Sequence, residues 1–212
     1  MADDNYTATL LVIDRSGSMT TIRDEMVGAL TTLLEKQAAE EGMLTVDVVT
    51  FDKVIERQDH FADPKDVVIR LEPRGGTALY DALGISIGEF GRDLAALPEH
   101  ARPGTVQVVV VTDGEENSSQ EYSLDTVRTL ITEQKEKYSW DFVFLGANQD
   151  AVLTGASLGI DADSSLTYAP DAEGVAGASE SLHRYMSSVR KKDKVGFLDE
   201  ERSRAEGRGT SA

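Results

Sequence analysis

The most constraining feature of the sequence is the apolar segment TVQVVVVT at residues 105–112, which contains no charged residue. A strand that is buried on both faces has this character, because neither face needs polar side chains. Two further segments, TATLLVI at 7–13 and DFVFLG at 141–146, are similar. Strands of this kind occur in parallel sheets that helices cover on both sides. The sequence therefore predicts a central, mainly parallel sheet.

Segments with helical spacing of apolar residues separate these strands. After the first strand, for example, Ile22, Met26 and Leu30 recur on one helix face. A more polar segment, 54–61, follows the strand at 43–51 after a tight turn and is expected at a sheet edge. The alternation predicts an α/β fold with a doubly wound, mainly parallel sheet, one antiparallel edge strand and helices on both faces. Helices are expected at 21–40, 78–97, 123–138, 148–157 and 171–190, and a short last strand at 165–168.

The length of 212 residues fits a single domain. We expect this domain to span residues 1–195. The final segment 196–212, GFLDEERSRAEGRGTSA, is polar and rich in glycine near its end, which predicts a flexible tail.

The chain is strongly acidic, with 38 acidic against 21 basic residues and a formal net charge of −17. Such a surface repels nucleic acids and anionic membranes and suits cations or basic partners. The absence of cysteine excludes disulfides and thiolate metal sites. The N-terminal segment has acids where a signal peptide needs bases, and no run of about 18 apolar residues is present. We therefore expect a cytoplasmic protein that binds neither nucleic acid nor membrane.

Two loops rich in oxygen atoms follow two of the most apolar strands. In DRSGS, Asp14 is the first residue after its strand, and in DGEEN the same position is Asp113. Ligands of doubly wound sheets bind beyond the carboxyl ends of the strands, where the strand order reverses. If these two strands are neighbours there, their loops face each other. Because two converging carboxylates repel unless a cation lies between them, the pair indicates a cation site.

The residue types in DRSGS also suit a cation. Asp14, Ser16 and Ser18 lie two residues apart, so that in an extended loop their side chains point in the same direction. Gly17 lets the backbone turn sharply. Carboxylates and hydroxyls are the oxygen ligands that hard cations such as Mg²⁺ prefer. Because hydroxyls are neutral, such an ion keeps an affinity for a further anionic oxygen from outside.

These residues resemble the metal-ion-dependent adhesion site of the von Willebrand factor A family. The family motif is Asp-x-Ser-x-Ser after the first strand, a threonine from a second loop and an aspartate from a third. DRSGS, RGGTAL and VVVTDGEEN match it here, and the resemblance covers about residues 7–190. It implies a Rossmann-like fold with Mg²⁺, Mn²⁺ or Ca²⁺ at its top, completed by a carboxylate of a partner. The implied metal ligands are Asp14, Ser16, Ser18, Thr77 and Asp113.

The residues beside these ligands bear on partner binding. Gly75 and Gly76 would let their loop approach the ion closely, and Glu115 and Glu116 are expected to be solvated. We place Gly76, Glu115 and Glu116 on the rim that a partner contacts. The chain resembles intracellular bacterial or phage members of the family, because it has neither a secretory signal nor a cysteine pair. Extracellular adhesion is therefore not implied.

Each loop also has an interpretation without a metal. DRSGS could be a strand-to-helix turn in which Asp14 or a serine caps the helix. RGGTAL could be a flexible turn with Thr77 as the cap of the next helix, and DGEEN a solvated acidic turn.

The ligand set and the resemblance favour a metal-dependent protein-binding module without catalysis, monomeric in isolation, whose ion binds a Glu or Asp of a protein partner. One alternative is a metal-dependent hydrolase in which the ion activates water and Glu115 or Asp81 is the general base. Against it, the sequence has no nucleophile elbow, no phosphate-binding loop and no histidine near the motifs. Another alternative is a structural component of a larger assembly.

Overall fold

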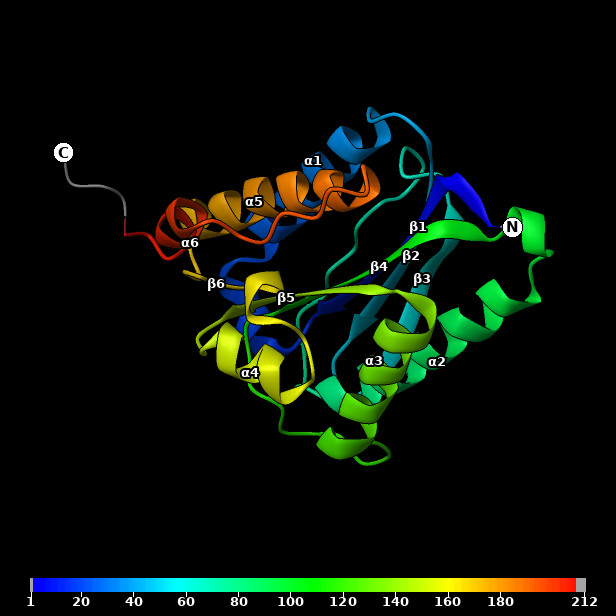
Figure 1. The fold of residues 1–212 in the computed structure, drawn as a ribbon. Coiled ribbons are helices and arrows are strands. Elements are labelled where there is room, and N and C mark those ends of the chain that lie inside the picture. Colours follow the sequence, from blue (N-terminus) through cyan, green and yellow to red (C-terminus); the bar gives the residue numbers. More distant parts are fainter. Residues whose placement is uncertain (1, 209–212) are drawn as a thin grey trace.

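The computed structural model describes residues 2–208 and contains a six-stranded sheet with the order β3-β2-β1-β4-β5-β6. Neighbouring strands are parallel except for β2 and β3, which are antiparallel. This confirms the predicted Rossmann-like, doubly wound α/β architecture with one antiparallel edge strand (Figure 1). The strands are β1 Asp3–Asp14, β2 Met43–Phe51, β3 Ile55–Ala62, β4 Pro103–Thr112, β5 Asp141–Ala147 and β6 Ser165–Tyr168.

Helices cover both faces of this sheet (Figure 1). Helices α1, α5 and α6 pack on one face, and α2, α3 and α4 pack on the other. No helix within residues 2–208 is both long and apolar enough to cross a bilayer. The α-helices are α1 Arg23–Ala38, α2 Leu79–Ala96, α3 Leu124–Tyr138, α4 Ala151–Ser157, α5 Ala172–Arg190 and α6 Asp199–Ala205, and the short 3-10 helices are Gly17–Thr21, Glu99–Ala101 and Ala162–Ser164.

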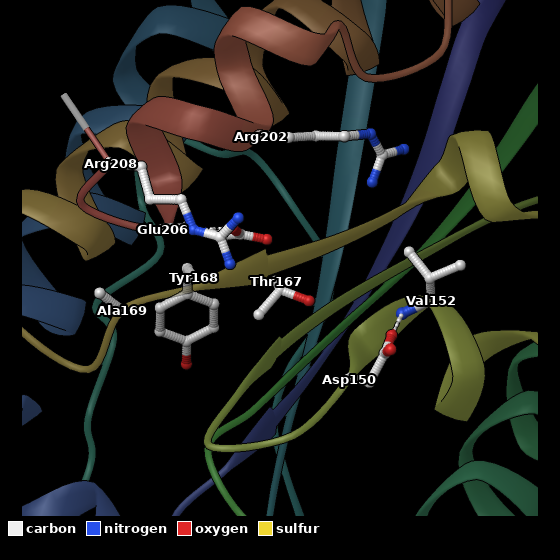
Figure 2. A pocket seen from close by; sticks show the side chains of 8 residues that line it. All are labelled: Asp150, Val152, Thr167, Tyr168, Ala169, Arg202, Glu206 and Arg208. Carbon is white, nitrogen blue, oxygen red and sulfur yellow. Dashed lines mark hydrogen bonds and ion pairs between the residues drawn. The ribbon is translucent and has the colours of Figure 1, made fainter. Parts of the chain in front are cut away.

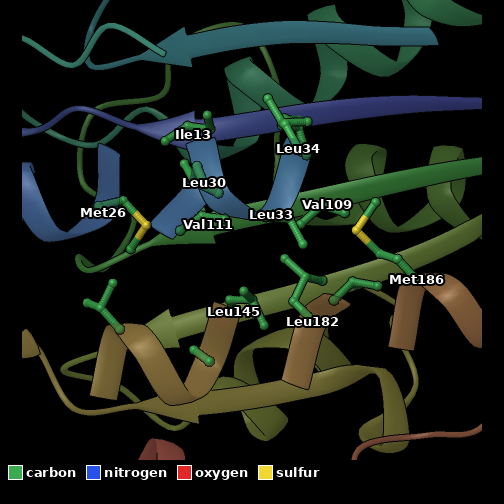
Figure 3. Close-up of a cluster of buried hydrophobic side chains, with 14 of the residues drawn as sticks. Ile13, Met26, Leu30, Leu33, Leu34, Val109, Val111, Leu145, Leu182 and Met186 are labelled. Carbon is green, nitrogen blue, oxygen red and sulfur yellow. The ribbon is translucent and has the colours of Figure 1, made fainter. Parts of the chain in front are cut away.

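The two faces of the sheet belong to two apolar clusters, because successive side chains of a strand point to opposite faces. On β4, Val109 and Val111 lie in the cluster with α1 and α5, whereas Val108 and Val110 lie in the cluster with α2 and α3. Figure 3 shows the first cluster, with Leu182 of α5 among the side chains that face the sheet. Burial on both faces explains why β4 is apolar almost throughout.

The strand order reverses between β1 and β4. These strands pair in parallel, with Ile13 opposite Val111, and β2 lies on the other side of β1. Their carboxyl ends therefore lie side by side at one edge of the sheet. This edge is where ligands of doubly wound sheets bind, and the two loops that contain Asp14 and Asp113 meet there.

The C-terminal segment differs from the expected flexible tail. Residues Asp199–Ala205 form α6, which packs on α5. Phe197 is 6% exposed, and its ring stacks on that of Tyr185 with centroids 5.0 Å apart. Arg184 of α5 forms an ion pair with the buried Glu201. One aromatic anchor and one ion pair thus fix a segment whose composition is largely polar, and its final four residues lie outside the described part of the chain.

Helix α6 also covers the edge of β6. Arg202 donates a hydrogen bond to the Ser165 carbonyl at 2.7 Å, and the Ala169 N–H donates to the Ala205 carbonyl at 2.8 Å. Figure 2 shows Arg202 beside this end of the sheet. Because an open edge strand exposes unpaired backbone groups, α6 protects this side of the sheet.

We predict that Phe197→Ala lowers the free energy of unfolding by about 3 kcal/mol, because it removes a buried ring and leaves a cavity. The control Leu198→Ala changes a neighbouring side chain that is 39% exposed, and it is expected to cost only about 0.5 kcal/mol. Urea unfolding followed by circular dichroism measures both. Equally small effects of the two substitutions would show that the segment is not packed.

Candidate metal centre

Asp14 is the last residue of β1, and its side chain is fully buried. The Oδ1 atom accepts a hydrogen bond from the Ser16 backbone N–H at 2.6 Å. The Oδ2 atom accepts one from the hydroxyl of Thr112, the last residue of β4, at 2.6 Å. The ends of two neighbouring strands therefore fix the position of this carboxylate.

Asp113 approaches the same place from the end of β4 and is 2% exposed. Its Oδ1 atom accepts a hydrogen bond from the Ser18 hydroxyl at 2.6 Å. The Ser18 hydroxyl oxygen in turn lies 3.0 Å from that of Ser16. Hydrogen bonds thus connect the DRSGS loop with the carboxylate of the second loop.

Thr77 adds a third hydroxyl, and the position of Gly114 shows where the three oxygens meet. A Cβ atom placed on Gly114 would lie 3.0 Å from Thr77 Oγ1. It would also lie 3.5 Å from Ser18 Oγ and 3.7 Å from Ser16 Oγ. The three hydroxyls therefore border one small space, which the glycine leaves free of a side chain. All five residues that the sequence predicts as metal ligands come together at this edge of the sheet.

Burial raises the pKa of both carboxyl groups. For Asp14 the pKa rises from 3.8 to about 6, chiefly through burial and in lesser part through the charge of Asp113. Hydrogen bonds from Thr112 and Ser16 oppose this rise. Burial also raises the pKa of Asp113, and the hydrogen bond from Ser18 offsets part of the effect. Two ionised carboxylates at this place are costly without a cation, which is the condition that favours metal binding.

The donor atoms fit a hard divalent cation. Two carboxylates and three hydroxyls supply only oxygen ligands, which Mg²⁺, Mn²⁺ and Ca²⁺ accept. Within residues 2–208, no group of three or more His, Asp or Glu side chains is placed to hold a metal ion. A cation at this centre would therefore depend on the hydroxyls as well as on the two carboxylates.

The Thr77 loop and the loop after β4 brace each other. The Thr77 N–H donates to Asn117 Oδ1 at 3.0 Å, and the Asn117 N–H donates back to the Thr77 carbonyl at 3.0 Å. In the first turn of α2, Asp81 accepts hydrogen bonds from the backbone N–H groups of residues 120–122 at 2.7 to 2.9 Å. These contacts fix the position of Thr77 relative to Asp113. Nothing in the local sequence marks Asn117 for this role, because its partner lies 40 residues earlier.

Glu116 is turned inward, which corrects its expected place on the solvated rim. Its Oε2 atom accepts a hydrogen bond from the Tyr80 N–H at 3.0 Å, near the start of α2. Its Oε1 atom accepts from the N–H groups of Ser118 and Ser119, both at 2.8 Å. A carboxylate at a helix N-terminus is favourable, so the side chain is used within the protein. Glu115, by contrast, is exposed.

Gly75 and Gly76 let the Thr77 loop pass close to its neighbours. Gly75 has a φ of +67°, which favours glycine, and its carbonyl accepts a hydrogen bond from the Gly17 N–H at 3.2 Å. A Cβ atom on Gly76 would lie 2.4 Å from Ser118 Oγ. The close approach at these glycines is therefore made to neighbouring protein loops.

Arg15, at a variable position of the DRSGS motif, is buried and links two loops. Its guanidinium group lies 3.3 Å from the carboxylate of Asp52 and also pairs with Glu56. Asp52 also accepts a hydrogen bond from Arg74 at 3.0 Å, and its carbonyl accepts one from the Ala78 N–H at 3.0 Å. The loop that carries Thr77 is thus tied to the end of β2. The motif alone gives no sign of this ion pair.

Comparisons with known proteins identify the fold. No family model and no curated protein matches the chain. Proximal thread matrix protein 1 from the mussel byssus, with a zinc-occupied MIDAS motif, is similar over 86% of this chain and 46% of that protein, with 15% identity and a TM-score of 0.59. The vWF domain of the pili tip protein Mfa5 from Porphyromonas gingivalis is similar over 91% of this chain and 97% of that chain, with 12% identity and a TM-score of 0.63.

A third similar structure is the manganese-loaded TRAP protein of Plasmodium vivax, with 68% of this chain and 57% of that chain covered, 14% identity and a TM-score of 0.52. The chain spans less than half of the mussel protein but nearly all of the Mfa5 domain. Identities this low show a common fold, and the strand order agrees with it. This chain has the fold of a von Willebrand factor A domain.

Proposed function

We propose that this chain is a divalent-metal-dependent protein-binding module without catalytic activity of its own. The observation that carries the proposal is the convergence of Asp14, Asp113 and three hydroxyl groups at the carboxyl edge of the sheet. The mussel protein and the TRAP protein add support, because both have this fold and hold a divalent ion, zinc in one and manganese in the other.

In this proposal the metal is Mg²⁺, with Mn²⁺ or Ca²⁺ as substitutes. When bound, the ion supplies a site of positive charge for an oxygen ligand from outside the chain. The serine and threonine hydroxyls carry no charge, so the ion keeps an affinity for a further carboxylate. A Glu or Asp of a protein partner is the ligand that completes such a site. The residues that would hold the ion are Asp14, Ser16, Ser18, Thr77 and Asp113.

The surroundings of the centre favour binding over hydrolysis. The hydrolase alternative needs a general base near the ion, and its two candidates are Glu115 and Asp81. The carboxylate of Asp81 already accepts hydrogen bonds from the three backbone N–H groups of residues 120–122. Glu115 is exposed, outside the buried donor set. Neither carboxylate is therefore held in a position where it would take a proton from a water molecule at the centre.

The partner that we propose is a protein with an accessible acidic side chain. The net charge of −17 disfavours nucleic acids and anionic membranes as partners. Gly76 and Glu115 remain on the proposed rim, whereas Glu116 is turned inward. The monomeric state, the cytoplasmic location and a bacterial or phage origin stay predictions of the sequence.

We predict that Mg²⁺ or Mn²⁺ stabilises the protein and that Asp14→Ala and Asp113→Ala each abolish this effect. A free ion at about 100 times its Kd adds about 2.7 kcal/mol of stability, which corresponds to a rise of about 5–10 °C in Tm. Thermal unfolding with the metal and with EDTA measures the effect. Glu115→Gln, the control, removes an exposed charge from the same loop and is expected to keep the metal response. A response that survives in both alanine variants would place the ion elsewhere.

We predict that the buried carboxyl group of Asp14 makes the metal-free protein less stable than it would otherwise be as the pH rises from about 4 to about 6. The folded state raises the pKa of Asp14 from 3.8 to about 6, so it binds this proton more tightly than the unfolded chain does. The contribution of Asp14 to the free energy of unfolding is fully present below about pH 4. About 3 kcal/mol of this contribution is lost once the pH exceeds about 6. Asp14→Asn removes this loss.

Urea unfolding across this pH range, with EDTA present, compares the wild type with Asp14→Asn. The variant is expected to be the more stable of the two at pH 7.5 without metal, and the less stable once saturating Mg²⁺ is added. The idea is wrong if the two proteins have parallel stability curves across the range.

We predict that a protein partner is recovered from a cell lysate with Mg²⁺, and that it is lost with EDTA and with Asp14→Ala. Glu115→Lys, which keeps the metal ligands, is expected to keep the metal dependence of recovery, and a changed yield would indicate that the rim contacts the partner. Quantitative mass spectrometry of the recovered proteins measures both. Mg²⁺-dependent turnover of phosphoesters that Asp14→Ala abolishes would favour the hydrolase instead.

A further inference from the structure

A second feature lies at the amino edge of the sheet, at the opposite ends of the strands from the proposed metal centre. A groove of about 480 Å³ runs between α2 and α3, which lie side by side on one face of the sheet (Figure 1). Pro103 and Val106 of β4 and the ring of Trp140 form part of its lining. Its volume lies in the range of pockets that bind small molecules.

Two glycines of α2 leave this groove open. A Cβ atom on Gly88 would meet only the guanidinium group of Arg92, at 3.6 Å, and one on Gly91 would meet only the ring of Trp140, also at 3.6 Å. Both positions thus have room for a Cβ atom without a close contact. Gly84, one turn earlier, is different, because a Cβ atom there would lie 2.2 Å from the ring of Tyr122.

Glycine inside a helix is destabilising relative to alanine. Close packing accounts for Gly84, but it does not account for Gly88 and Gly91. Both glycines line the groove, so the absence of their side chains leaves this part of it open.

The walls of the groove are apolar, while its charges are all positive. Ile87, Leu94 and Leu130 line it together with Trp140. The charged residues that line it are Arg92 and Arg102, and no acidic residue is among the lining residues. This is unusual in a chain with 38 acidic and 21 basic residues.

Arg92 has no charged partner in the part of the chain that the structure describes. Within residues 2–208, it forms no ion pair, because its neighbours Glu89 and Asp93 pair with Arg57 instead. Arg102 differs, since it donates hydrogen bonds to carbonyls at the end of α2, at 2.7 and 3.0 Å. Those bonds also offset the negative end of the helix.

A second hollow, beside α6, lacks this combination (Figure 2). There Arg202 donates to the carbonyls of Ala162 and Ser165, and Arg208 pairs with Glu206. Its positive charges are therefore already engaged. Apolar walls with a free guanidinium group distinguish the groove between α2 and α3.

We propose that this groove binds a small amphipathic carboxylate. Its apolar body would lie against Trp140 and the aliphatic wall, and its carboxylate would pair with Arg92. A guanidinium group is a good partner for a carboxylate because it donates two parallel hydrogen bonds. This inference is independent of the proposed metal centre at the other edge of the sheet.

The test uses octanoate as the probe and the neutral octanamide as its matched control. Trp140 is the only tryptophan of the chain, so its fluorescence reports binding in the groove. Octanoate is expected to change this fluorescence saturably, and octanamide is expected to bind about tenfold more weakly because it lacks the charge-assisted contact. Isothermal titration calorimetry gives the Kd of both.

Two variants locate the site. Gly88→Leu fills the groove and is expected to abolish octanoate binding. Arg92→Gln removes the positive charge but keeps a polar side chain, and it is expected to make octanoate bind as weakly as octanamide. Gly28→Leu is the matched control, because it makes the same change on α1, where a Cβ atom would meet nothing within 4 Å. If Gly88→Leu does not fold, Arg92→Gln still decides the outcome.

Three results would overturn the proposal. The first is equal binding of octanoate and octanamide in the wild type. The second is unchanged octanoate binding in Gly88→Leu or in Arg92→Gln. The third is a homodimer that only Gly88→Leu dissociates, which would make the groove an interface between copies of the chain. Octanoate binding is expected to persist with EDTA and in Asp14→Ala, so a failure of the metal proposal leaves this one intact.

Discussion

The parallel pairing of β1 with β4 is the contact on which the site depends. It brings the carboxyl ends of two strands together from positions about a hundred residues apart, and it places Asp14 next to the hydroxyl of Thr112. Burial there makes the ionised form of Asp14 costly, as its raised pKa shows. A cation between the carboxylates would relieve this cost, and our functional proposal rests on that electrostatic condition. The burial of these two acidic side chains at one place therefore favours the binding of a cation.

The loops around this pair act as one unit because each is tied to another by polar contacts. Asn117 holds the backbone of Thr77, Asp81 holds residues 120–122, and Arg15 links the DRSGS loop to the end of β2. A site with donors already in position loses less conformational entropy when it binds an ion than a flexible loop would. The acids and amides of the surroundings therefore position the hydroxyl groups of the proposed metal centre and are not themselves among its proposed ligands.

The two edges of the sheet have opposite character, and the connections explain the difference. At the carboxyl edge, loops converge and present oxygen atoms. At the amino edge, α2 and α3 border an apolar groove that Gly88 and Gly91 leave open, and Arg92 lines it without an ion pair among the described residues. Two sites of different chemistry can therefore coexist on one domain, separated by the length of the strands.

The sequence by itself determined the strands, the helices other than α6, and the approximate position of the candidate site. Apolar runs such as residues 105–112 predict a strand that is buried on both faces. The motif predicts the oxygen-rich loops that follow these strands. Only the tertiary structure decided the inward turn of Glu116, the packing of Phe197 in the expected tail and the open groove at Arg92. The local sequence pattern shows which faces of a strand or helix are buried. The positions of these three side chains depend instead on contacts with backbone groups or rings that are distant in the sequence.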